Sequence, residues 1–510
     1  MGSSTNKTKR RYLTCLKVLE KRNQTHVLRW WEDLRVPQRQ RLLADLESIP
    51  WFLLDPVLRE LGSAAAPNLL NAELEPPEVL PHSPPPHDVA LYEKARERGA
   101  TLLRMGKVAA FTVAGGQGTR LGFDGPKGMV RVTPVGDRSL FALFAAMVKA
   151  ARDRYRALIP WYIMTSPGNH AETIDYFAKN DWFGLPQCDV RIFPQGMLPA
   201  FDFDGRLVLA ARDRIAMAPD GHGGSLKAIA TSGALSDMQQ RGIEIISYFQ
   251  VDNPLVKPFD PLFLGLHAER QSEMSTKVTA KSDDLEKVGN VCLRNGRLVI
   301  VEYSNFPEAL AHSKNAAGGR KFDSGNLAIH LLDVVFVDRI AGGTAGDRSN
   351  SLAEGLPASD HATSESRSAG CDGGSFPLPL RQARKIVPFI DELGALVKPT
   401  EPNAIKLESF IFDALPLAKR TLVLEVERAE EFSPVKNRDG ADSLGSARRD
   451  QVRRACRWLE AAGVSIPRDT NGEPNITLDI APSFALDQDD VVAQADRLPV
   501  LRANTVIELA

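Results

Sequence analysis

A glycine-rich loop carries the residue types that bind phosphate. Residues 113–128 read VAGGQGTRLGFDGPKG and directly follow an apolar run. Glycines let successive backbone N–H groups approach an anion, and the start of a following helix adds its positive end. The planar guanidinium of Arg120 can donate two parallel hydrogen bonds to phosphate oxygens, and the ammonium of Lys127 can bind them as a point charge. The stretch therefore predicts a binding site for a phosphate group.

Several chemistries use loops of this kind, and the spacing separates them. A Walker A loop requires G-x-x-x-x-G-K-[ST], which GFDGPKG does not supply. A dinucleotide loop requires G-x-G-x-x-G, but Gly116 and Gly118 are followed by Leu121. The next predicted strand also ends in IMTSPG, without the acidic residue that would hold a ribose. A tight turn without ligand stays as an alternative, although it has no need of two basic residues, and a phosphate-binding loop of another class is favoured.

The surrounding pattern predicts the elements that position this loop. KVAAFTVA reads as a buried strand that leads into the loop, and IPWYIMTS and GIEIISYFQVDN read as further strands, the last ending at Asp252. Between the first two, Ser139 can cap a helix with a one-sided apolar stripe. The stripe consists of Leu140, Leu143, Phe144, Met147, Val148 and Ala151. This alternation predicts an α/β fold with a mostly parallel sheet and right-handed crossovers.

Two turn signals modify that sheet. Asp204-Gly205 and Asn295-Gly296 each lie between apolar runs, which is typical of β-hairpins. The sheet is therefore expected to be mixed, with antiparallel additions.

Composition excludes several classes of protein. The chain has 510 residues and a formal net charge of −1, so no broad basic face for nucleic acid is expected. Its five cysteines lie far apart without a C-x-x-C pair, which argues against a disulfide framework and a zinc site. No uninterrupted apolar run of about 18 residues indicates a membrane span. A reduced, cytoplasmic protein is expected, and nothing in the sequence addresses oligomeric state.

A resemblance to a known family sharpens these expectations. AGGQGTRLGFDGPKGM resembles the signature of the UDP-sugar pyrophosphorylases, and most of all that of the UDP-N-acetylglucosamine/galactosamine pyrophosphorylases. Other segments resemble that family in the same order, over roughly residues 90–450. They are IPWYIMTS, FPQGMLPAFDFDG, MAPDGHGG, VDNPLVK, VEYS, SGNLAIH, IKLESFIFD and EFSPVKN.

The resemblance implies an architecture. It is a Rossmann-like nucleotidyltransferase (GT-A-like) fold, with a central mixed sheet flanked by helices. We expect residues 1–100 to form a helical region with a proline-rich linker, EPPEVLPHSPPPHD, which lies extended on the surface. Residues 101–436 would form the catalytic uridylyltransferase domain and residues 437–510 a small α+β domain. Residues 341–375 have almost no large apolar side chains and are expected to be a disordered insertion.

The resemblance also implies a reaction. Such enzymes join UTP to a sugar 1-phosphate, release pyrophosphate and use Mg²⁺. The sugar implied is N-acetylglucosamine 1-phosphate. Glucose or galactose 1-phosphate is the alternative within enzymes, and a non-catalytic UDP-sugar-binding protein is the alternative outside them. Loss of Arg120, Lys127 or Asp252 would mark that last class, and all three are present.

Site residues follow from the resemblance, position by position. Arg120 would hold the departing pyrophosphate, Lys127 the α-phosphate, and Asp252 the Mg²⁺, with no second carboxylate ligand obvious. Lys406 and Lys436 would approach the phosphates from later in the chain. Nucleotide contacts are implied for Gly115, Gly116, Gly118, Gln195, Gly221, His222 and Gly223. Sugar contacts are implied for Gly289, Glu302, Tyr303 and Asn326.

One position departs from the family's pattern. In GHGG, His222 stands where the N-acetylhexosamine enzymes usually carry asparagine, whereas UDP-glucose pyrophosphorylases carry histidine in a similar motif. A lone histidine is more often structural, but beside three glycines it has few packing roles. His222 is therefore expected to contact nucleotide or sugar, and it leaves the sugar open.

Overall fold

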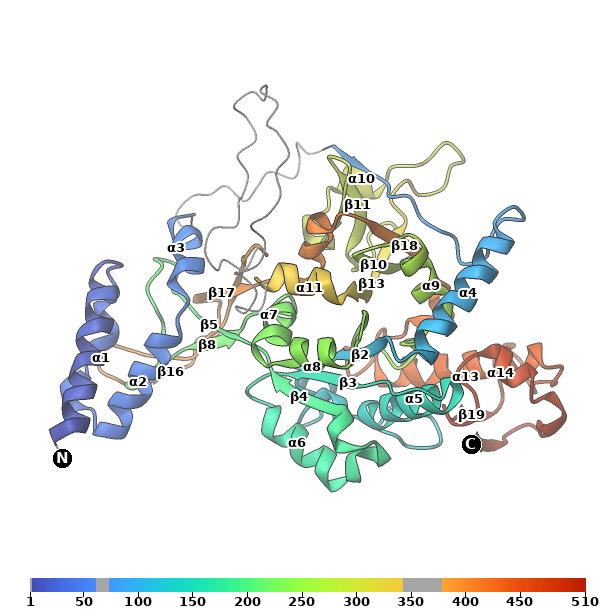
Figure 1. The fold of residues 1–510 in the computed structure, drawn as a ribbon, viewed down its shortest axis with the longest axis horizontal. Coiled ribbons are helices and arrows are strands. Elements are labelled where there is room, and N and C mark those ends of the chain that lie inside the picture. Colours follow the sequence, from blue (N-terminus) through green and yellow to red (C-terminus); the bar gives the residue numbers. More distant parts are fainter. Residues whose placement is uncertain (1, 61–72, 343–377) are drawn as a thin grey trace. The chain divides into compact units, whose positions relative to one another are not determined.

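The computed structural model describes residues 2–60, 73–342 and 378–510. It contains two compact units, each made of discontinuous segments (Figure 1). The smaller comprises Met1–Asn68, Gly196–Lys227 and Ile340–Ile411, and the larger Leu69–Gln195, Ala228–Arg339 and Phe412–Ala510. The contiguous domains expected from the sequence, 1–100, 101–436 and 437–510, stay a prediction. The expected insertion lies, from residue 343 onward, outside the described residues.

The larger unit is built on a ten-stranded sheet whose parallel half contains the predicted strands. Four neighbouring strands run parallel in the order β9, β2, β3, β4. They are β9 (Ile245–Gln250), β2 (Val108–Val113), β3 (Trp161–Thr165) and β4 (Val190–Pro194). Because they are parallel, their carboxyl ends meet at one edge, where open α/β sheets bind ligands.

The other half of the sheet is mostly antiparallel, as the Asn295-Gly296 signal predicted, although its strand β18 (Thr421–Glu425) pairs parallel with β10. The Asp204-Gly205 turn, flanked by an antiparallel bridge between Phe201 and Leu207, belongs to the smaller unit instead. Strand β13 (Ser324–Asp333) runs antiparallel to β9 and also pairs with β10 (Met274–Ala280) and β11 (Asn290–Arg294). Strands β11 and β12 (Arg297–Val301) form the predicted hairpin, with Asn295 and Gly296 both at positive φ. The mixed sheet is thus confirmed.

Helices of the larger unit pack where the apolar stripes predicted. Helix α5 (Leu140–Tyr155) is capped by Ser139, whose Oγ accepts from the Ala142 N–H at 3.1 Å, and all six stripe residues are buried. Helices α4 (Val89–Arg104) and α9 (Pro261–Glu269) approach so closely that a Cβ on Gly265 would lie 1.6 Å from the Ala95 carbonyl oxygen. That contact requires glycine.

The proline-rich linker is extended, as expected, but it is not confined to the surface. The Leu80 N–H donates to the Val423 carbonyl at 2.9 Å, and the Leu80 carbonyl accepts from Glu425 at 2.9 Å. These bonds fasten the linker along β18 (Thr421–Glu425), and the Leu80 side chain packs against the main core. Because the apolar side chain of Leu80 packs against the core, this part of the linker is partly buried.

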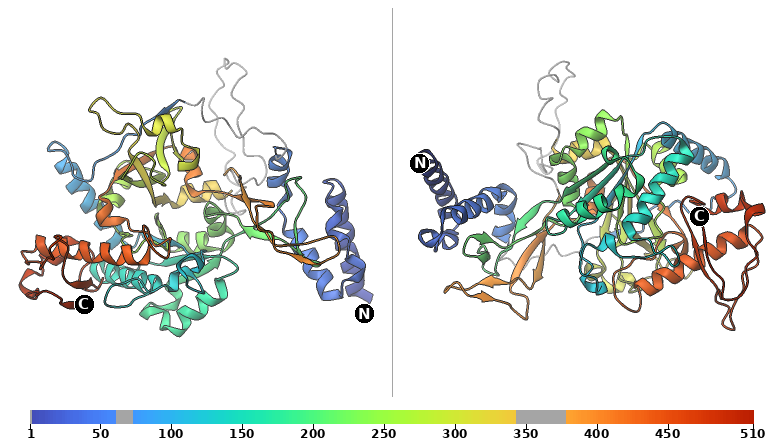
Figure 2. Two further views of the ribbon diagram at one scale, coloured as in Figure 1. Left: turned by 180° about the vertical axis from the view of Figure 1, so that it is seen from behind. Right: turned by 90° about the horizontal axis from the view of Figure 1, so that it is seen from below.

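The C-terminal segment of the larger unit has an apolar cluster of its own. It combines α13 (Leu444–Ala461) and α14 (Gln488–Val492) with the parallel pair β19 (Thr477–Ile480) and β20 (Val506–Leu509). Arg154 on α5 pairs with Asp487 at the start of α14 at 2.7 Å. Figure 2 shows this segment, coloured red, beside the central helices.

The smaller unit contains the predicted N-terminal helices, α1 (Gly2–Glu20), α2 (Val36–Ser48) and α3 (Trp51–Glu60). Pro37 lies in the first turn of α2 and starts that helix, since a proline needs no N–H partner there. Short strand pairs share the helices' core. They are β5 (Met197–Pro199) with β8 (Met217–Pro219), β6 (Leu209–Ala211) with β7 (Arg214–Ile215), β14 (Arg381–Lys385) with β17 (Ala404–Glu408), and β15 (Phe389–Ile390) with β16 (Leu396–Val397).

The remaining regular elements are short. They are β1 (Leu74–Glu75), α6 (His170–Lys179), α7 (Gly224–Thr231), α8 (Ala234–Gln240), α10 (Glu308–Ala311), α11 (Val334–Ala341) and α12 (Arg428–Glu431). Across the described ranges, no helix combines the length and apolar character needed to cross a membrane.

Candidate functional site

The glycine loop leaves β2 at the carboxyl edge of the parallel strands. The Ala114 N–H donates to the Met164 carbonyl at 2.7 Å, so the loop starts level with the end of β3. The Asn169 side-chain amide, which is 1% exposed, donates to the carbonyls of Ala114 at 3.0 Å and Gly116 at 3.3 Å. Asn169 thus fixes the first turn of the loop, a role that no spacing in the sequence indicated.

The loop then folds back on itself. The Gly118 N–H donates to the Gly125 carbonyl at 2.8 Å, and the Lys127 N–H donates to the Gly116 carbonyl at 3.0 Å. A Cβ on Gly118 would lie 2.8 Å from Phe123 Cδ1, so this position has room only for glycine.

The α-helix that follows the loop is α5, which begins at Leu140, as Ser139 predicted. Two 3₁₀ turns, Thr119–Leu121 and Lys127–Met129, come before α5 begins at Leu140. The fold-back bonds of the loop keep its chain in tight turns, so the helix starts only after the chain has left the sheet edge. The start of α5 nevertheless lies beside the end of the loop, because the Leu140 N–H donates to the Val130 carbonyl at 3.0 Å and a Cβ on Gly128 would lie 2.2 Å from the Phe141 ring.

Lys127 and Asp252 meet at this edge. Lys127 Nζ lies 3.4 Å from Asp252 Oδ2, with side chains 17% and 13% exposed. The register explains the encounter, because Val251 N–H donates to the Val113 carbonyl at 3.0 Å, placing Asp252 beside the loop's root. Arg120 stands exposed on the turn Thr119–Leu121. An ammonium and a carboxylate, both half-shielded, can hold phosphate oxygens and a cation side by side.

Lys436 reaches the same region through a backbone contact. The Val435 N–H donates to the Asp252 carbonyl at 2.8 Å. Buried Asn253 supports this contact by donating to the Glu431 carbonyl at 2.6 Å and accepting from the Ser433 N–H at 3.1 Å. The ammonium of Lys436 itself pairs with Asp442 at 3.4 Å. Asn253, like Asn169, was missed from sequence because an isolated asparagine carries no pattern.

Gln195 lies against the first glycine of the loop. Its N–H donates to the Thr165 carbonyl at 2.7 Å. This bond continues the pairing of β4 with β3 by one residue. A Cβ on Gly115 would lie 2.5 Å from Gln195 Oε1. The structure thus brings Gly115, Gly116, Gly118, Gln195, Lys127 and Asp252 to one edge; we call this set the phosphate-side group.

Three of the four predicted sugar contacts lie together on the antiparallel half. A Cβ on Gly289 would lie 3.7 Å from Glu302 Oε1 and 3.8 Å from Asn326 Cβ. The Asn326 N–H donates to the Gly289 carbonyl at 2.9 Å. Tyr303 follows Glu302, with 47% of its surface exposed. Gly289, Glu302 and Asn326 are the sugar-side group.

The remaining predicted residues belong to the smaller unit. The chain turns tightly against Ser409 at Gly221 and Gly223, and Gly221 has φ +84°. The Gly223 N–H donates to the Ser409 carbonyl at 2.8 Å, and the Ser409 N–H donates to the Asp220 carbonyl at 2.8 Å. A Cβ on Gly221 would lie 2.4 Å from the Ser409 carbonyl oxygen, which requires glycine there. Lys406 lies on β17, three residues before Ser409.

His222 sits in that turn as a neutral ring. Its Nδ1 accepts from the Ile411 N–H at 3.2 Å, and its ring centroid lies 5.1 Å from that of Phe410. Burial, together with the nearby Arg381 guanidinium, lowers the pKa of His222 to about 4. Because Nδ1 accepts, the single ring proton is on Nε2, so His222 offers one N–H donor near neutral pH.

A cavity of about 430 Å³ lies elsewhere in the larger unit. It is lined by charged side chains such as Arg154, Lys257 and Arg454, and by none of the predicted site residues. The predicted chemistry rests on the sheet edge, so we do not place it in this cavity.

Within the described ranges, no group of three or more histidine, cysteine, aspartate or glutamate side chains is arranged to hold a metal ion. Asp252 is the carboxylate that lies beside Lys127, with Asp252 Oδ2 3.4 Å from Lys127 Nζ. One carboxylate fits a Mg²⁺ ion that takes its other oxygens from phosphates and water.

Comparison with known proteins gives a consistent set of matches. The model of the family described as UTP–glucose-1-phosphate uridylyltransferase matches residues 78–340. The chain is 34% identical over 494 residues to mouse UDP-N-acetylhexosamine pyrophosphorylase-like protein 1, covering 91% of each chain. It is 32% identical to the UDP-N-acetylglucosamine pyrophosphorylase of Saccharomyces cerevisiae, covering 87% of this chain and 90% of that one. A solved structure of the Trypanosoma brucei UDP-N-acetylglucosamine pyrophosphorylase, bound to an inhibitor, has the same fold (TM-score 0.75, 24% identity, 98% of each chain).

Proposed function

Because this chain belongs to the UTP–glucose-1-phosphate uridylyltransferase family, we propose that it couples UTP to N-acetylglucosamine 1-phosphate and releases pyrophosphate. The relatives named above support the sugar, since the yeast protein is named for UDP-N-acetylglucosamine. The observation that carries the proposal is the 3.4 Å approach of Lys127 to Asp252 at the edge that holds the glycine loop.

The proposed reaction needs alignment and charge more than it needs a base. The second pKa of a phosphate monoester is about 6, so the attacking oxygen is already ionised near neutral pH. Catalysis then consists of holding the nucleophile in line with the α-phosphorus and stabilising charge on the leaving pyrophosphate. Lys127, partly shielded from water, would bind the α-phosphate, and exposed Arg120 the pyrophosphate. The exposure of Arg120 suits a leaving group that must depart to solvent.

Asp252 would hold Mg²⁺ in this site. When bound, the ion would neutralise charge on the phosphates of UTP. The protein's own contribution is the placement of Asp252: the Val251 and Val435 N–H groups fix the backbone on either side of it. Lys127 shares the Asp252 carboxylate and would balance the same negative charge.

The sugar-side group would bind the hexose. The Glu302 carboxylate can accept hydrogen bonds from sugar hydroxyls, and the Asn326 amide can donate to the sugar or to its acetamide. Gly289 leaves room beside Glu302, because any side chain there would meet Ile300 Cγ2 at 2.7 Å.

A second substrate is favoured by one observation. His222 stands where the N-acetylhexosamine enzymes usually carry asparagine, whereas UDP-glucose pyrophosphorylases carry histidine in a similar motif. Glucose or galactose 1-phosphate is therefore the alternative sugar. In either case Gly221, His222 and Gly223 would contact the nucleotide, with Gln195 as a further contact to uracil, while Lys406 and Lys436 would approach the phosphates.

A panel of substrates tests the proposal. The protein is incubated with UTP, Mg²⁺ and each of several sugar 1-phosphates while pyrophosphate is measured. We expect release with N-acetylglucosamine 1-phosphate above all. A preference for unacetylated sugars would move the assignment to the alternative substrate. Tight UDP-sugar binding in calorimetry without turnover in either direction would indicate a binding protein instead.

We also propose a cytoplasmic location. The cysteines in the described residues, Cys15, Cys188, Cys292 and Cys456, are free thiols, as a reducing compartment favours. Fractionation of cells followed by detection of the protein tests this, and recovery in a secretory fraction would contradict it.

A further inference from the structure

A buried lysine lies directly behind the sugar-side group. Lys281 is 4% exposed and is the first residue after β10, at the start of the loop 281–289 that ends at Gly289. Burial lowers the pKa of its ammonium. Burying an ammonium costs free energy unless it is well bonded, so a lysine at this place needs a specific function.

The ammonium of Lys281 is bonded to two neutral oxygens of its own loop region. It donates to Asn290 Oδ1 at 3.0 Å and to the Asp284 carbonyl at 3.3 Å. Its bond to Oδ1 orients the Asn290 amide, whose Nδ2 then donates to the Val288 carbonyl at 3.4 Å. Gly289 lies between Val288 and Asn290. The lysine therefore sets the peptide that bears Gly289.

The stem of Lys281 also contacts the strand that carries Asn326. A Cβ on Gly325 would lie 3.5 Å from Lys281 Cγ, and Gly325 immediately precedes Asn326. Gly325 pairs with Asn290 across β11 and β13, and the Asn326 N–H donates to the Gly289 carbonyl at 2.9 Å. One side chain thus contacts both β11, which directly follows Gly289, and β13, which carries Asn326.

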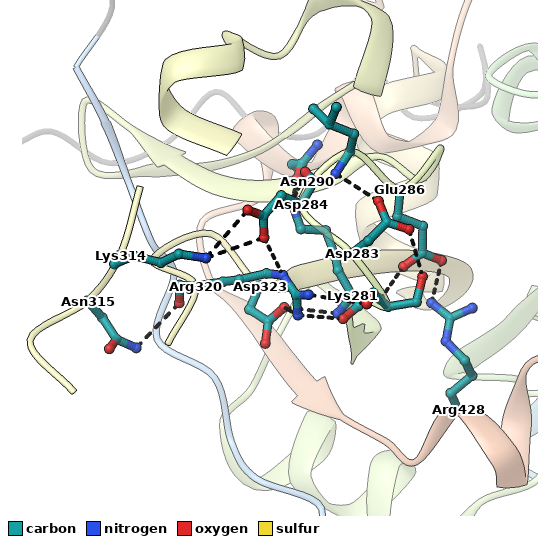
Figure 3. Close-up of polar contacts among 12 residues, drawn as sticks. Lys281, Asp283, Asp284, Glu286, Asn290, Lys314, Asn315, Arg320, Asp323 and Arg428 are labelled. Carbon is teal, nitrogen blue, oxygen red and sulfur yellow. Dashed lines mark hydrogen bonds and ion pairs between the residues drawn. The ribbon is translucent and has the colours of Figure 1, made fainter. Parts of the chain in front are cut away.

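Ion pairs hold the same loop to the hairpin 312–323, in which Lys314 and Arg320 form an antiparallel bridge, and to α12 through Arg428 (Figure 3). Asp284 pairs with Arg320 at 2.7 Å and with Lys314 at 3.4 Å, and Glu286 pairs with Arg428 at 2.5 Å. Ion pairs that water can reach contribute little to stability, because solvent screens them. They restrict the loop, but the buried contacts of Lys281 determine the position of Gly289.

We propose that Lys281 is a positioning residue for sugar 1-phosphate specificity: through Asn290 it fixes Gly289 beside Glu302 and Asn326. This inference rests on the proposed function. Lys281 does not touch the substrate and acts only on the sugar side, so UTP binding is independent of it.

The test compares Michaelis constants for the two substrates. Lys281→Met should raise the KM for the sugar 1-phosphate on the order of tenfold, because small misplacements of binding groups are costly. The KM for UTP should change by less than about twofold, since the phosphate-side group is on other strands. Lys321→Met, which removes the same charge from an exposed position on the hairpin 312–323, is the matched control and should leave both constants unchanged.

Asn290→Ala is the second variant, and together with Lys281→Met it allows a double-mutant cycle. If Lys281 acts through Asn290, both single variants raise the sugar KM, and the double variant raises it no further than the stronger single one. Additive effects would contradict the route through Asn290. Melting curves accompany each variant, and where Lys281→Met lacks a cooperative transition, Asn290→Ala decides.

The outcomes separate this inference from the proposed function. If the wild-type protein turns over no sugar 1-phosphate, the proposed function is wrong, and the role of Lys281 in sugar specificity is wrong with it. Wild-type turnover with an unchanged sugar KM in folded Lys281→Met overturns the positioning role alone. An equal rise in both KM values also overturns it, because that pattern reports general loosening of the fold.

Discussion

The phosphate-side and sugar-side groups are built in different ways. On the phosphate side, residues close in sequence fold back on themselves through backbone bonds, such as Gly118 to Gly125, and Asp252 joins from one neighbouring strand. On the sugar side, Gly289 precedes β11, Glu302 follows β12 and Asn326 lies on β13; they meet through sheet register and a buried lysine. Local backbone geometry leaves a sequence signature, whereas long-range register does not.

The difference also suggests a division of labour. The phosphate-side residues would act on groups common to every reaction with UTP, and the sugar-side residues on the variable substrate. Changes on the first side should therefore lower kcat or raise the KM for UTP, and changes on the second should raise the KM for the sugar 1-phosphate.

The largest expected effect is that of Lys127→Ala. Removing one preorganised contact to the transition state costs about 10²–10³ in rate, so kcat should fall by more than about a hundredfold. Steady-state pyrophosphate release measures this, with melting curves to confirm the fold. Lys149→Ala, on the exposed face of α5, is the matched control and should behave as wild type. A near-normal rate for Lys127→Ala would remove this lysine from the chemistry.

Asp252→Asn should come next. The amide preserves the shape and can still accept from Lys127, but it loses the charge that Mg²⁺ prefers. We expect kcat to fall about a hundredfold and the Mg²⁺ concentration for half-maximal rate to rise, because charged contacts to the reacting phosphates are lost. A Mg²⁺ titration of the rate checks this. An unchanged titration curve would show that the ion, if needed, is held elsewhere.

Two glycine substitutions, one in each group, are expected to have smaller effects. At Gly115, a Cβ would press on Gln195 Oε1 at 2.5 Å; at Gly289, it would press on Ile300 Cγ2 at 2.7 Å. We expect Gly115→Ala to raise the KM for UTP and Gly289→Ala the KM for the sugar 1-phosphate, each roughly tenfold, about the cost of a displaced contact. If either substitution raised both constants equally, the division between the sides would fail.

The smallest expected effect separates folding from chemistry. Burial lowers the pKa of His267 to about 3, and its Nδ1 is bonded to Ser275 Oγ at 2.7 Å. Between about pH 3 and pH 6.5, His267 is protonated in the unfolded chain but neutral in the folded protein. The free energy of unfolding therefore falls as the pH is lowered through this window, and it no longer depends on His267 above the window. Buried His222 contributes in the same direction.

Denaturant unfolding at several pH values measures this slope. His267→Gln should make it shallower, while leaving the ratio of the two KM values unchanged at neutral pH. A slope of the opposite sign, or one unaffected by the substitution, would contradict the assignment of His267 as a buried neutral ring.

Much of the fold could be predicted where the determinant is local. Ser139 caps α5, the apolar stripe is buried, and Asn295-Gly296 makes its hairpin, since each depends on a few adjacent residues. The two 3₁₀ turns within the glycine loop were not predicted, because they are imposed by hydrogen bonds that form only when the loop folds back on itself. Leu80 was placed on the surface, but its strand-like bonds to Val423 and Glu425 could not be foreseen from a run of prolines.

The candidate site was predicted in part for the same reason. The glycines and basic residues of the loop have a spacing that chemistry restricts, so Lys127 could be chosen from the residues themselves. Asn169, Asn253 and Lys281 could not, because each is a single polar residue that matters only through partners brought from elsewhere by the fold. The sugar-side residues were assigned by family resemblance, and their roles stay predictions.

The sugar preference of the wild-type protein tests the central claim most directly. We would measure kcat/KM by pyrophosphate release for N-acetylglucosamine 1-phosphate and glucose 1-phosphate at saturating UTP and Mg²⁺. A site that bonds the acetamide should reject the sugar lacking it by well over tenfold, since buried polar groups would be left unpaired. A preference for glucose 1-phosphate would contradict the sugar assignment, and no release with either sugar would contradict the function itself.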